Sequence, residues 1–168
     1  KGVKEMQGFD RIILVLYGAI TIFFIYRLFK QTRDRKLLGE NAKAFKKPIS
    51  SMEMILFSIL LVVGGVNFIN GYRVEDKYSM ITAVVMIILA IVFMIFSLSK
   101  LYVAENGMLI ASGFVSFKEL KKWGFDTNRG ELVMAVKKDG NNTRESVKVR
   151  KEDIEEINEL IRKYKLGK

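Results

Sequence analysis

Three long apolar runs within the first 99 residues restrict what this chain can fold into more than any other feature. The runs cover residues 12–29, 54–70 and 79–99. Because an α-helix rises 1.5 Å per residue, each run forms a helix of roughly 25–32 Å, which matches the roughly 30 Å hydrocarbon core of a bilayer. One such run would suit a buried helix of a soluble protein, but three in succession predict a membrane domain with three transmembrane helices.

The first run has a competing interpretation as a cleaved signal peptide. Its apolar segment is too long for that role, and basic residues follow it where a small-residue cleavage site would be needed. Its single charge, Arg27, lies within a turn of the end, where a long side chain reaches the headgroups. The first helix is therefore expected to stay in the mature chain as an anchor.

Positive charge predicts the orientation of the three helices. Seven basic residues lie between the first two runs, whereas residues 71–78 hold only Arg73 and Lys77, offset by Glu75 and Asp76. Because Lys and Arg accumulate in cytoplasmic loops, the first loop is expected inside the cell. The prediction is a multi-pass protein of the cell membrane, with its N-terminus outside and its C-terminus in the cytoplasm.

The basic loop, residues 30–53, is assigned to the membrane domain, residues 1–99. One interpretation is a solvated linker whose charge serves only as the topology signal. The other is contact with anionic lipid headgroups, since each basic residue near such a surface contributes about 1 kcal/mol. Its seven basic residues are the first candidate membrane-contact set: Lys30, Arg33, Arg35, Lys36, Lys43, Lys46 and Lys47.

Composition excludes several classes of chemistry. The chain has no Cys and no His, so it has no disulfides, no thiol nucleophile, no imidazole base and no zinc site built on those residues. It has neither a GxSxG sequence nor paired carboxylates within the apolar runs. We therefore expect a non-enzymatic protein without a cofactor or metal. The net charge of +10 favours an anionic membrane over nucleic acid, given the three runs.

Residues 100–168 have a different pattern and predict a cytosolic α+β domain. Short strand-like segments follow the third run, and "ELVMAVK" and "RESVKVR" flank a hairpin turn at Asp139-Gly140. In the second of these segments, Val147 and Val149 alternate with polar residues, which is typical of a strand with one buried face. Four or five short strands are expected, forming a small antiparallel sheet.

The last segment predicts an amphipathic helix that closes the sheet. Its apolar residues fall on one stripe at helical spacing: Ile154, Ile157, Leu160, Ile161 and Tyr164. Acidic residues in the first turn and basic residues in the last turn suit the helix dipole. The remaining acidic residues of this helix are interpreted as a solvated face rather than a metal site.

The order of strands and closing helix resembles the small PH-like domains that follow transmembrane helices in bacterial membrane proteins of unknown function. The resemblance rests on Gly107-Met108-Leu109, on the segment from Phe117 to Leu120 and on Trp123, and it covers roughly residues 100–166. The tail resembles a shortened version of that fold, with fewer strands than a complete one. The resemblance implies a binding or scaffolding module without catalytic residues.

Trp123, the only Trp of the chain, has two interpretations. It is expected to be the largest residue of the sheet core. Alternatively, its ring lies at the lipid headgroups. Three lysines in the neighbouring sequence complete the second candidate membrane-contact set: Lys118, Lys121, Lys122 and Trp123.

The resulting hypothesis is a non-enzymatic integral membrane protein whose PH-like domain binds or scaffolds at the inner leaflet. The expected partner is a bilayer with anionic headgroups, with other membrane proteins or a second copy of the chain as alternatives. Two other functions stay open: an accessory subunit of a transporter or other membrane complex, and an immunity or envelope-stress protein.

Overall fold

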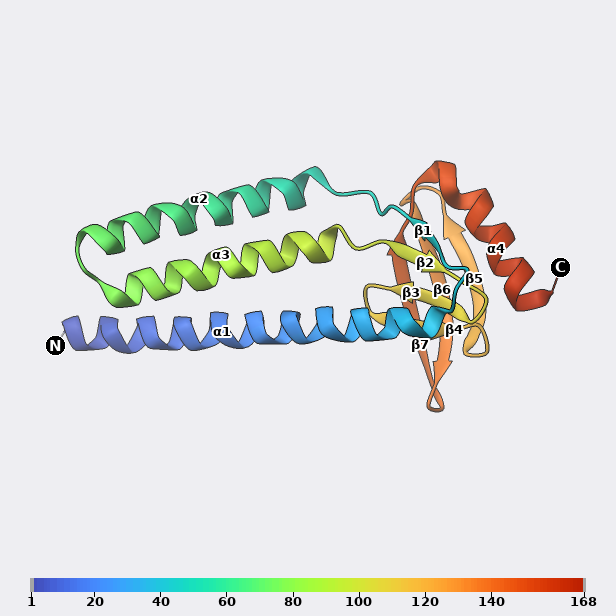
Figure 1. The fold of residues 1–168 in the computed structure, drawn as a ribbon, viewed down its shortest axis with the longest axis horizontal. Helices are drawn as coiled ribbons and strands as arrows, with labels where there is room; N and C mark the ends of the chain where they lie inside the picture. The colour runs from blue at the N-terminus through green and yellow to red at the C-terminus, as the bar shows by residue number, and fades with distance from the viewer. Residues whose placement is uncertain (1, 168) are drawn as a thin grey trace. The chain divides into compact units, whose positions relative to one another are not determined.

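The computed structural model describes residues 2–167 and divides the chain into two compact units (Figure 1). The first unit holds the residues up to Leu28 together with Ile49–Ser97. The second holds Phe29–Pro48 together with the residues from Leu98 onward. Each unit is therefore built from two separate stretches of the chain.

Long helices form the first unit: α1 (Gly2–Arg35, up to Leu28 in this unit), α2 (Ser51–Arg73) and α3 (Lys77–Ser97). Among the described residues, these three helices are long and apolar enough to cross a membrane. The three predicted runs are confirmed as helices, although the helices differ from the runs at their ends. The largest difference is in α1, which begins at Gly2 rather than at residue 12 and continues beyond residue 29 to Arg35.

Side-chain caps begin two of these helices. The Ser50 hydroxyl accepts a hydrogen bond from the Met52 amide at 3.2 Å at the start of α2. At the start of α3, Asp76 accepts from the Tyr78 amide at 3.0 Å and from the Ser79 hydroxyl at 2.6 Å. The bond from the Ser79 side chain is the main cause that lowers the pKa of Asp76.

Small residues let α2 and α3 approach closely. A Cβ on Gly64 would come within 2.9 Å of Ile87 Cγ1, and a Cβ on Gly71 would come within 3.0 Å of the Met80 amide nitrogen. By contrast, a Cβ on Gly65 would meet nothing within 4 Å. Of the two adjacent glycines of α2, only Gly64 therefore allows close packing.

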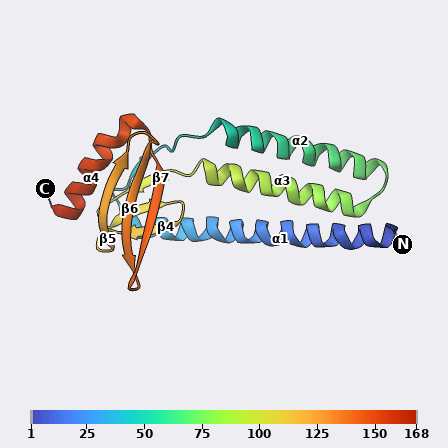
Figure 2. The ribbon, with the colours of Figure 1, turned by 180° about the vertical axis from the view of Figure 1, so that it is seen from behind.

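Two antiparallel sheets and a closing helix form the second unit (Figures 1 and 2). The first sheet has the order β1 (Lys43–Phe45), β2 (Leu101–Val103), β3 (Gly107–Ile110) and β4 (Gly113–Ser116). The second has the order β5 (Leu120–Asp126), β6 (Glu131–Lys138) and β7 (Asn141–Lys148). Short 3₁₀ helices cover Lys36–Leu38 and Lys151–Asp153, and α4 (Ile154–Leu166) follows.

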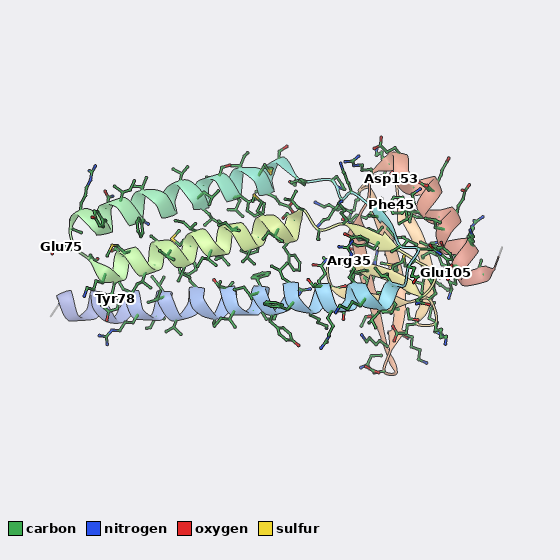
Figure 3. The ribbon with its side chains drawn as sticks, in the orientation of Figure 1. Arg35, Phe45, Glu75, Tyr78, Glu105 and Asp153 are labelled. Atoms are coloured by element: carbon green, nitrogen blue, oxygen red, sulfur yellow. The ribbon has the colours of Figure 1, made fainter. Side chains whose placement is uncertain are left out.

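The strand β1 corrects the expectation that residues 30–53 are a linker of the membrane domain. Lys43 lies opposite Val103 and Phe45 lies opposite Leu101, so the loop supplies an edge strand of the first sheet. Phe45 is buried in the main core of the unit (Figure 3). Leu38 is buried against Ala104 and Leu109. These two apolar side chains hold the basic loop in the domain because exposing them to water is unfavourable.

The hairpin of β6 and β7 turns at the predicted Asp139-Gly140. Both residues have positive φ, 50° and 83°, as expected for a two-residue turn of type I′. The two residues after the turn, Asn141 and Asn142, begin β7 and pair with Lys138 and Lys137.

The main core lies between the two sheets and α4. Ile157 and Ile161 of α4 are fully buried, and Ile154, Leu160 and Tyr164 pack against the core with partial burial. The predicted amphipathic stripe is therefore confirmed, with the deepest contacts at its two central isoleucines.

This ranking of burial predicts two different stability effects. Ile157→Ala is expected to lower the free energy of unfolding by about 2–5 kcal/mol, because it empties a fully buried site. Leu160→Ala is expected to lower the free energy of unfolding by less, since part of the Leu160 side chain already contacts solvent. Urea unfolding of the two variants, followed by Trp123 fluorescence, measures the difference. Equal losses would contradict the packing of α4 described above.

Candidate functional site

Two basic residues of the 30–53 loop make contacts inside the second unit. The guanidinium of Arg35, which is labelled in Figure 3, lies 4.7 Å from the centre of the Tyr102 ring. Lys43 forms an ion pair with Glu156 of α4. These two side chains therefore join the loop to the sheet and to the closing helix, in addition to any role at a membrane surface.

The other basic residues of the first candidate set are distributed over two environments. Lys30 and Arg33 line a cavity of the second unit. Lys36 and Lys46 are exposed and Lys47 is half-buried. The structure thus separates a set that the sequence treated as one surface.

The second candidate set does not form one patch either. Lys118, Lys121 and Lys122 are exposed, whereas Trp123 is half-buried and donates a hydrogen bond from Nε1 to Asn158 Oδ1 at 3.0 Å. Successive residues of a strand point to opposite faces, so Lys122 and Trp123 lie on opposite sides of β5. Trp123 packs on the core side, at the margin of the core, as one of its partly buried members.

The outer face of the second sheet carries a group of basic side chains that sequence reasoning did not assemble. The register places Lys122, Ala135 and Arg144 in one row across the strands, and Lys137 and Lys148 lie on the same face. All of these residues are exposed. We call Lys122, Lys137, Arg144 and Lys148 the basic outer face.

The opposite side of β5 has a different character. A groove of about 680 Å³ lies there, lined by Trp123 and by residues of α4: Glu159, Arg162, Lys163 and Leu166. The outward side of α4 and its preceding turn also carry Glu152, Glu155 and Glu159, all exposed. The Trp123 side is therefore mixed in charge. The outer face of the sheet carries its four basic side chains together with two acidic ones, Asp126 and Glu131, so basic residues predominate there.

A second concave site, which we call the charged cavity, has a volume of about 330 Å³. The end of α1, the turn between β3 and β4, and the inward face of the β6–β7 hairpin form its walls. Its α1 wall includes Asp34, which is only 7% exposed and lies beside Gly113: a Cβ on Gly113 would be 3.4 Å from Asp34 Oδ2.

Polar residues on the inward face of the hairpin form the far wall of the charged cavity. Glu145 lies opposite the buried Met134, and Thr143 lies opposite the buried Val136, so both are on the core side of their strand. Lys138 follows on the same face of β6 and also lines the cavity. The inward face therefore changes from apolar to charged toward the hairpin turn, where the cavity begins.

Among the side chains that the structure describes, no group of three or more Asp, Glu, His or Cys residues is arranged to hold a metal ion. The acidic residues of α4 point along a solvated face, and the carboxylates of the charged cavity are mixed with basic groups. The chemistry available at these sites is charge pairing and hydrogen bonding.

Comparison with known proteins gives one finding for the second unit. Residues 99–166 match the family described as "Domain of unknown function (DUF5673)". No curated protein matches the chain. The matched region begins just before β2 and ends in α4, so it excludes Phe29–Pro48, which the structure places in the same unit.

Sequence reasoning missed Asp34, Lys138 and Glu145 as members of a common site. A signal was present for Glu145, because it falls on the same alternation as Val147 and Val149 and therefore on the buried face of its strand. Asp34 carried no such signal, since it stands among basic residues and resembles part of a solvated loop.

Proposed function

We propose that this chain is a non-enzymatic membrane protein with three spans, and that its second unit is a PH-like binding or scaffolding module at the inner leaflet. The observation that carries the proposal is the pairing of β1 with β2, because it unites chain segments on either side of α2 and α3.

The pairing supports the topology independently of the charge count. Strands that pair must lie on the same side of a membrane, so the chain between Phe45 and Leu101 must cross it an even number of times. The helices α2 and α3 supply two crossings. Leu38 belongs to the same unit and follows α1 directly, so a spanning α1 begins on the opposite side. The excess of basic residues in the first loop then favours a cytoplasmic domain.

The links between the unit and the helices support a position close to the membrane. Only residues 98–100 separate α3 from β2, and residues 46–50 separate β1 from α2. An extended chain spans at most about 3.6 Å per residue, so β2 begins within about 15 Å of the end of α3. This distance is comparable to the roughly 10 Å Debye length at 0.1 M salt, so charges on the domain interact with headgroups.

Charge favours one face of the domain for that interaction. The inner leaflet is anionic and attracts Lys and Arg near its surface. The basic outer face offers four such side chains against the two carboxylates of Asp126 and Glu131 on the same face. The groove beside Trp123 offers two, Arg162 and Lys163, together with Glu159. We therefore assign membrane contact to the three lysines of the second candidate set and to the basic outer face. We do not assign it to Trp123.

The PH-like assignment is supported by the arrangement of the strands. The sequence predicted four or five strands in one small sheet for the tail, fewer than a complete fold of that kind. The tail instead supplies six strands, and the loop before α2 adds β1, so the described residues of this unit form two antiparallel sheets of four and three strands with a closing helix. This larger number of strands supports the proposal. Such folds host many functions, so the assignment implies binding or scaffolding and no particular ligand.

Orientation can be measured directly in this cysteine-free chain. Val74→Cys, at an exposed turn between α2 and α3, is expected to react with an impermeant maleimide on intact cells. Glu40→Cys, at an exposed position of the first loop, is expected to react only after permeabilisation. The reverse pattern would overturn the orientation, and accessibility of both from one side would overturn the spanning of α2.

Membrane contact is tested with the full chain in nanodiscs. A fluorophore attached to Ala135→Cys reports contact of the basic outer face with lipid. The single Trp, Trp123, reports contact of the opposite side of β5. In discs with phosphatidylglycerol, lipids carrying a quencher at the headgroup are expected to quench the Ala135 probe at low salt and to lose this effect at high salt. Trp123 is expected to be unaffected in both conditions.

Discs without anionic lipid are the matched control, and the Ala135 probe is expected to be unquenched there. Quenching of Trp123 instead of the Ala135 probe would reverse the assigned face. If neither is quenched in anionic discs, the charge serves only as a topology signal. Protein partners, such as those of an accessory subunit of a membrane complex, would then replace the bilayer as the binding target.

A further inference from the structure

The charged cavity has more charge than a structural role requires. Six ionisable side chains line it: Lys30, Arg33, Asp34, Glu119, Lys138 and Glu145. The ion pairs found among the side chains that the structure describes join Lys43 to Glu156, Arg129 to Asp126 and Arg150 to Glu152, so no cation of the cavity lies within 4.0 Å of one of its carboxylates. The cavity therefore presents both signs of charge without a close ion pair between them.

Asp34 is the most buried of these six ionisable residues. Asp34 as a whole residue is only 7% exposed, and a carboxylate in such surroundings costs free energy unless polar or cationic groups stabilise it. Asp34 could have turned toward Lys30, four residues earlier on the same helix, at a spacing that suits a helical ion pair. Instead its carboxylate lies at the turn between β3 and β4, beside Gly113, in the wall of the cavity.

The position of the cavity along α1 indicates the source of a ligand. Phe29 is the last residue of the first apolar run, and Lys30 follows it directly in the same helix. With a rise of 1.5 Å per residue, Lys30 to Asp34 lie about 2–8 Å beyond the end of that run. If α1 spans the bilayer, as in the proposed function, this wall of the cavity is at the depth of the lipid headgroups.

We propose that the charged cavity binds a zwitterionic phosphate–ammonium group, as carried by a phosphatidylethanolamine headgroup. Arg33 and Lys30 bind the phosphate, since a guanidinium donates paired hydrogen bonds to phosphate oxygens. Asp34 and Glu145 accept hydrogen bonds from the ammonium group. The volume of about 330 Å³ is at the lower end of the range for small-molecule sites and suits a headgroup rather than a whole lipid. This inference rests on the proposed function for the placement of α1.

The test uses the full chain, purified in mild detergent and examined by native mass spectrometry with defined lipids. Phosphatidylethanolamine is expected to be retained more strongly than phosphatidylglycerol, which has the phosphate without the ammonium group. Arg33→Gln is expected to weaken retention of both lipids by about tenfold, because it removes a charged donor to phosphate. Glu145→Gln is expected to weaken the retention of phosphatidylethanolamine only.

Lys36→Gln is the matched control, since Lys36 is an exposed basic residue of the same segment that does not line the cavity. It is expected to retain both lipids like the parent chain. A thermal unfolding measurement on each variant separates loss of binding from loss of fold, and similar transition temperatures are expected because Arg33 is exposed and Glu145 is only half-buried.

Retention that is equal for both lipids, or equally weakened by Lys36→Gln, would overturn the proposal. Displacement by free phosphoethanolamine at the same concentration as the lipid would overturn the lipid source and assign a soluble ligand of the same chemistry. The cysteine-labelling experiment keeps the two proposals separate. If Val74→Cys and Glu40→Cys label as expected but Arg33→Gln has no effect, the charged cavity is not the site and the proposed function stands.

Discussion

A fragment of residues 98–168, although it contains the whole DUF5673 match, is expected to be unfolded on its own. It lacks the strand β1 and the side chains of Leu38 and Phe45, which are 1% and 4% exposed in the structure. Truncating one buried Leu or Phe costs about 2–5 kcal/mol, and small domains have only about 5–15 kcal/mol of stability in total. Losing both residues and an edge strand is therefore comparable to the whole stability of the unit.

A second fragment provides the matched comparison. Phe45 and Leu101 lie directly opposite each other in the sheet, so a short Gly/Ser linker can replace α2 and α3 and join residues 29–48 to 98–168. This joined fragment is expected to fold, with dispersed amide signals in NMR and a cooperative urea transition. Cooperative folding of the shorter fragment, or loss of folding in both, would contradict the role assigned to β1.

The second large effect is expected at Gly107, at the start of β3. A Cβ at this position would overlap the carbonyl oxygen of Val115 and would come within 2.8 Å of Phe114 Cζ. The first obstacle is backbone of the neighbouring strand, so it cannot move without disturbing the pairing of β3 with β4. Gly107→Ala is expected to lower the free energy of unfolding by about 3 kcal/mol or more.

Gly124 offers a control of the same chemistry in another strand. A Cβ there would meet nothing within 4 Å, so Gly124→Ala is expected to be neutral or to stabilise by up to about 1 kcal/mol, because Ala restricts the unfolded chain. Urea unfolding of both variants, in the joined fragment and in the full chain, measures the contrast. A loss at Gly124 as large as that at Gly107 would show that the close approach of the β3–β4 backbone does not explain the effect.

The parts of the fold that could be predicted are those with a local signal. The apolar runs, the Asp139-Gly140 turn and the isoleucine stripe of α4 each depend on residues close together in sequence, so a pattern was sufficient to find them. The hairpin turn even has the positive φ values that its sequence requires.

The strand β1 had no comparable signal. It is three residues long, contains one buried side chain and pairs with a strand more than fifty residues later. Leu38 and Phe45 were visible as apolar residues among basic ones, but the pattern did not indicate where they would be buried. The same limit applies to the charged cavity, because its walls come from three separate segments of the chain. Only the inward position of Glu145 could be predicted from the sequence.

The insertion of α2 and α3 between two paired strands has a consequence for biosynthesis. At about 5–20 residues per second, Leu101 is synthesised roughly 3–11 s after Phe45, so β1 must wait for its partner until α2 and α3 have been made. If these two helices span a membrane, as proposed, insertion of only one of them leaves β2 on the wrong side and the first sheet cannot close. A folded second unit would then be evidence, within a single polypeptide, that both helices have been inserted. Molecules that fail this step expose Leu38 and Phe45, the kind of apolar surface that chaperones and proteases recognise.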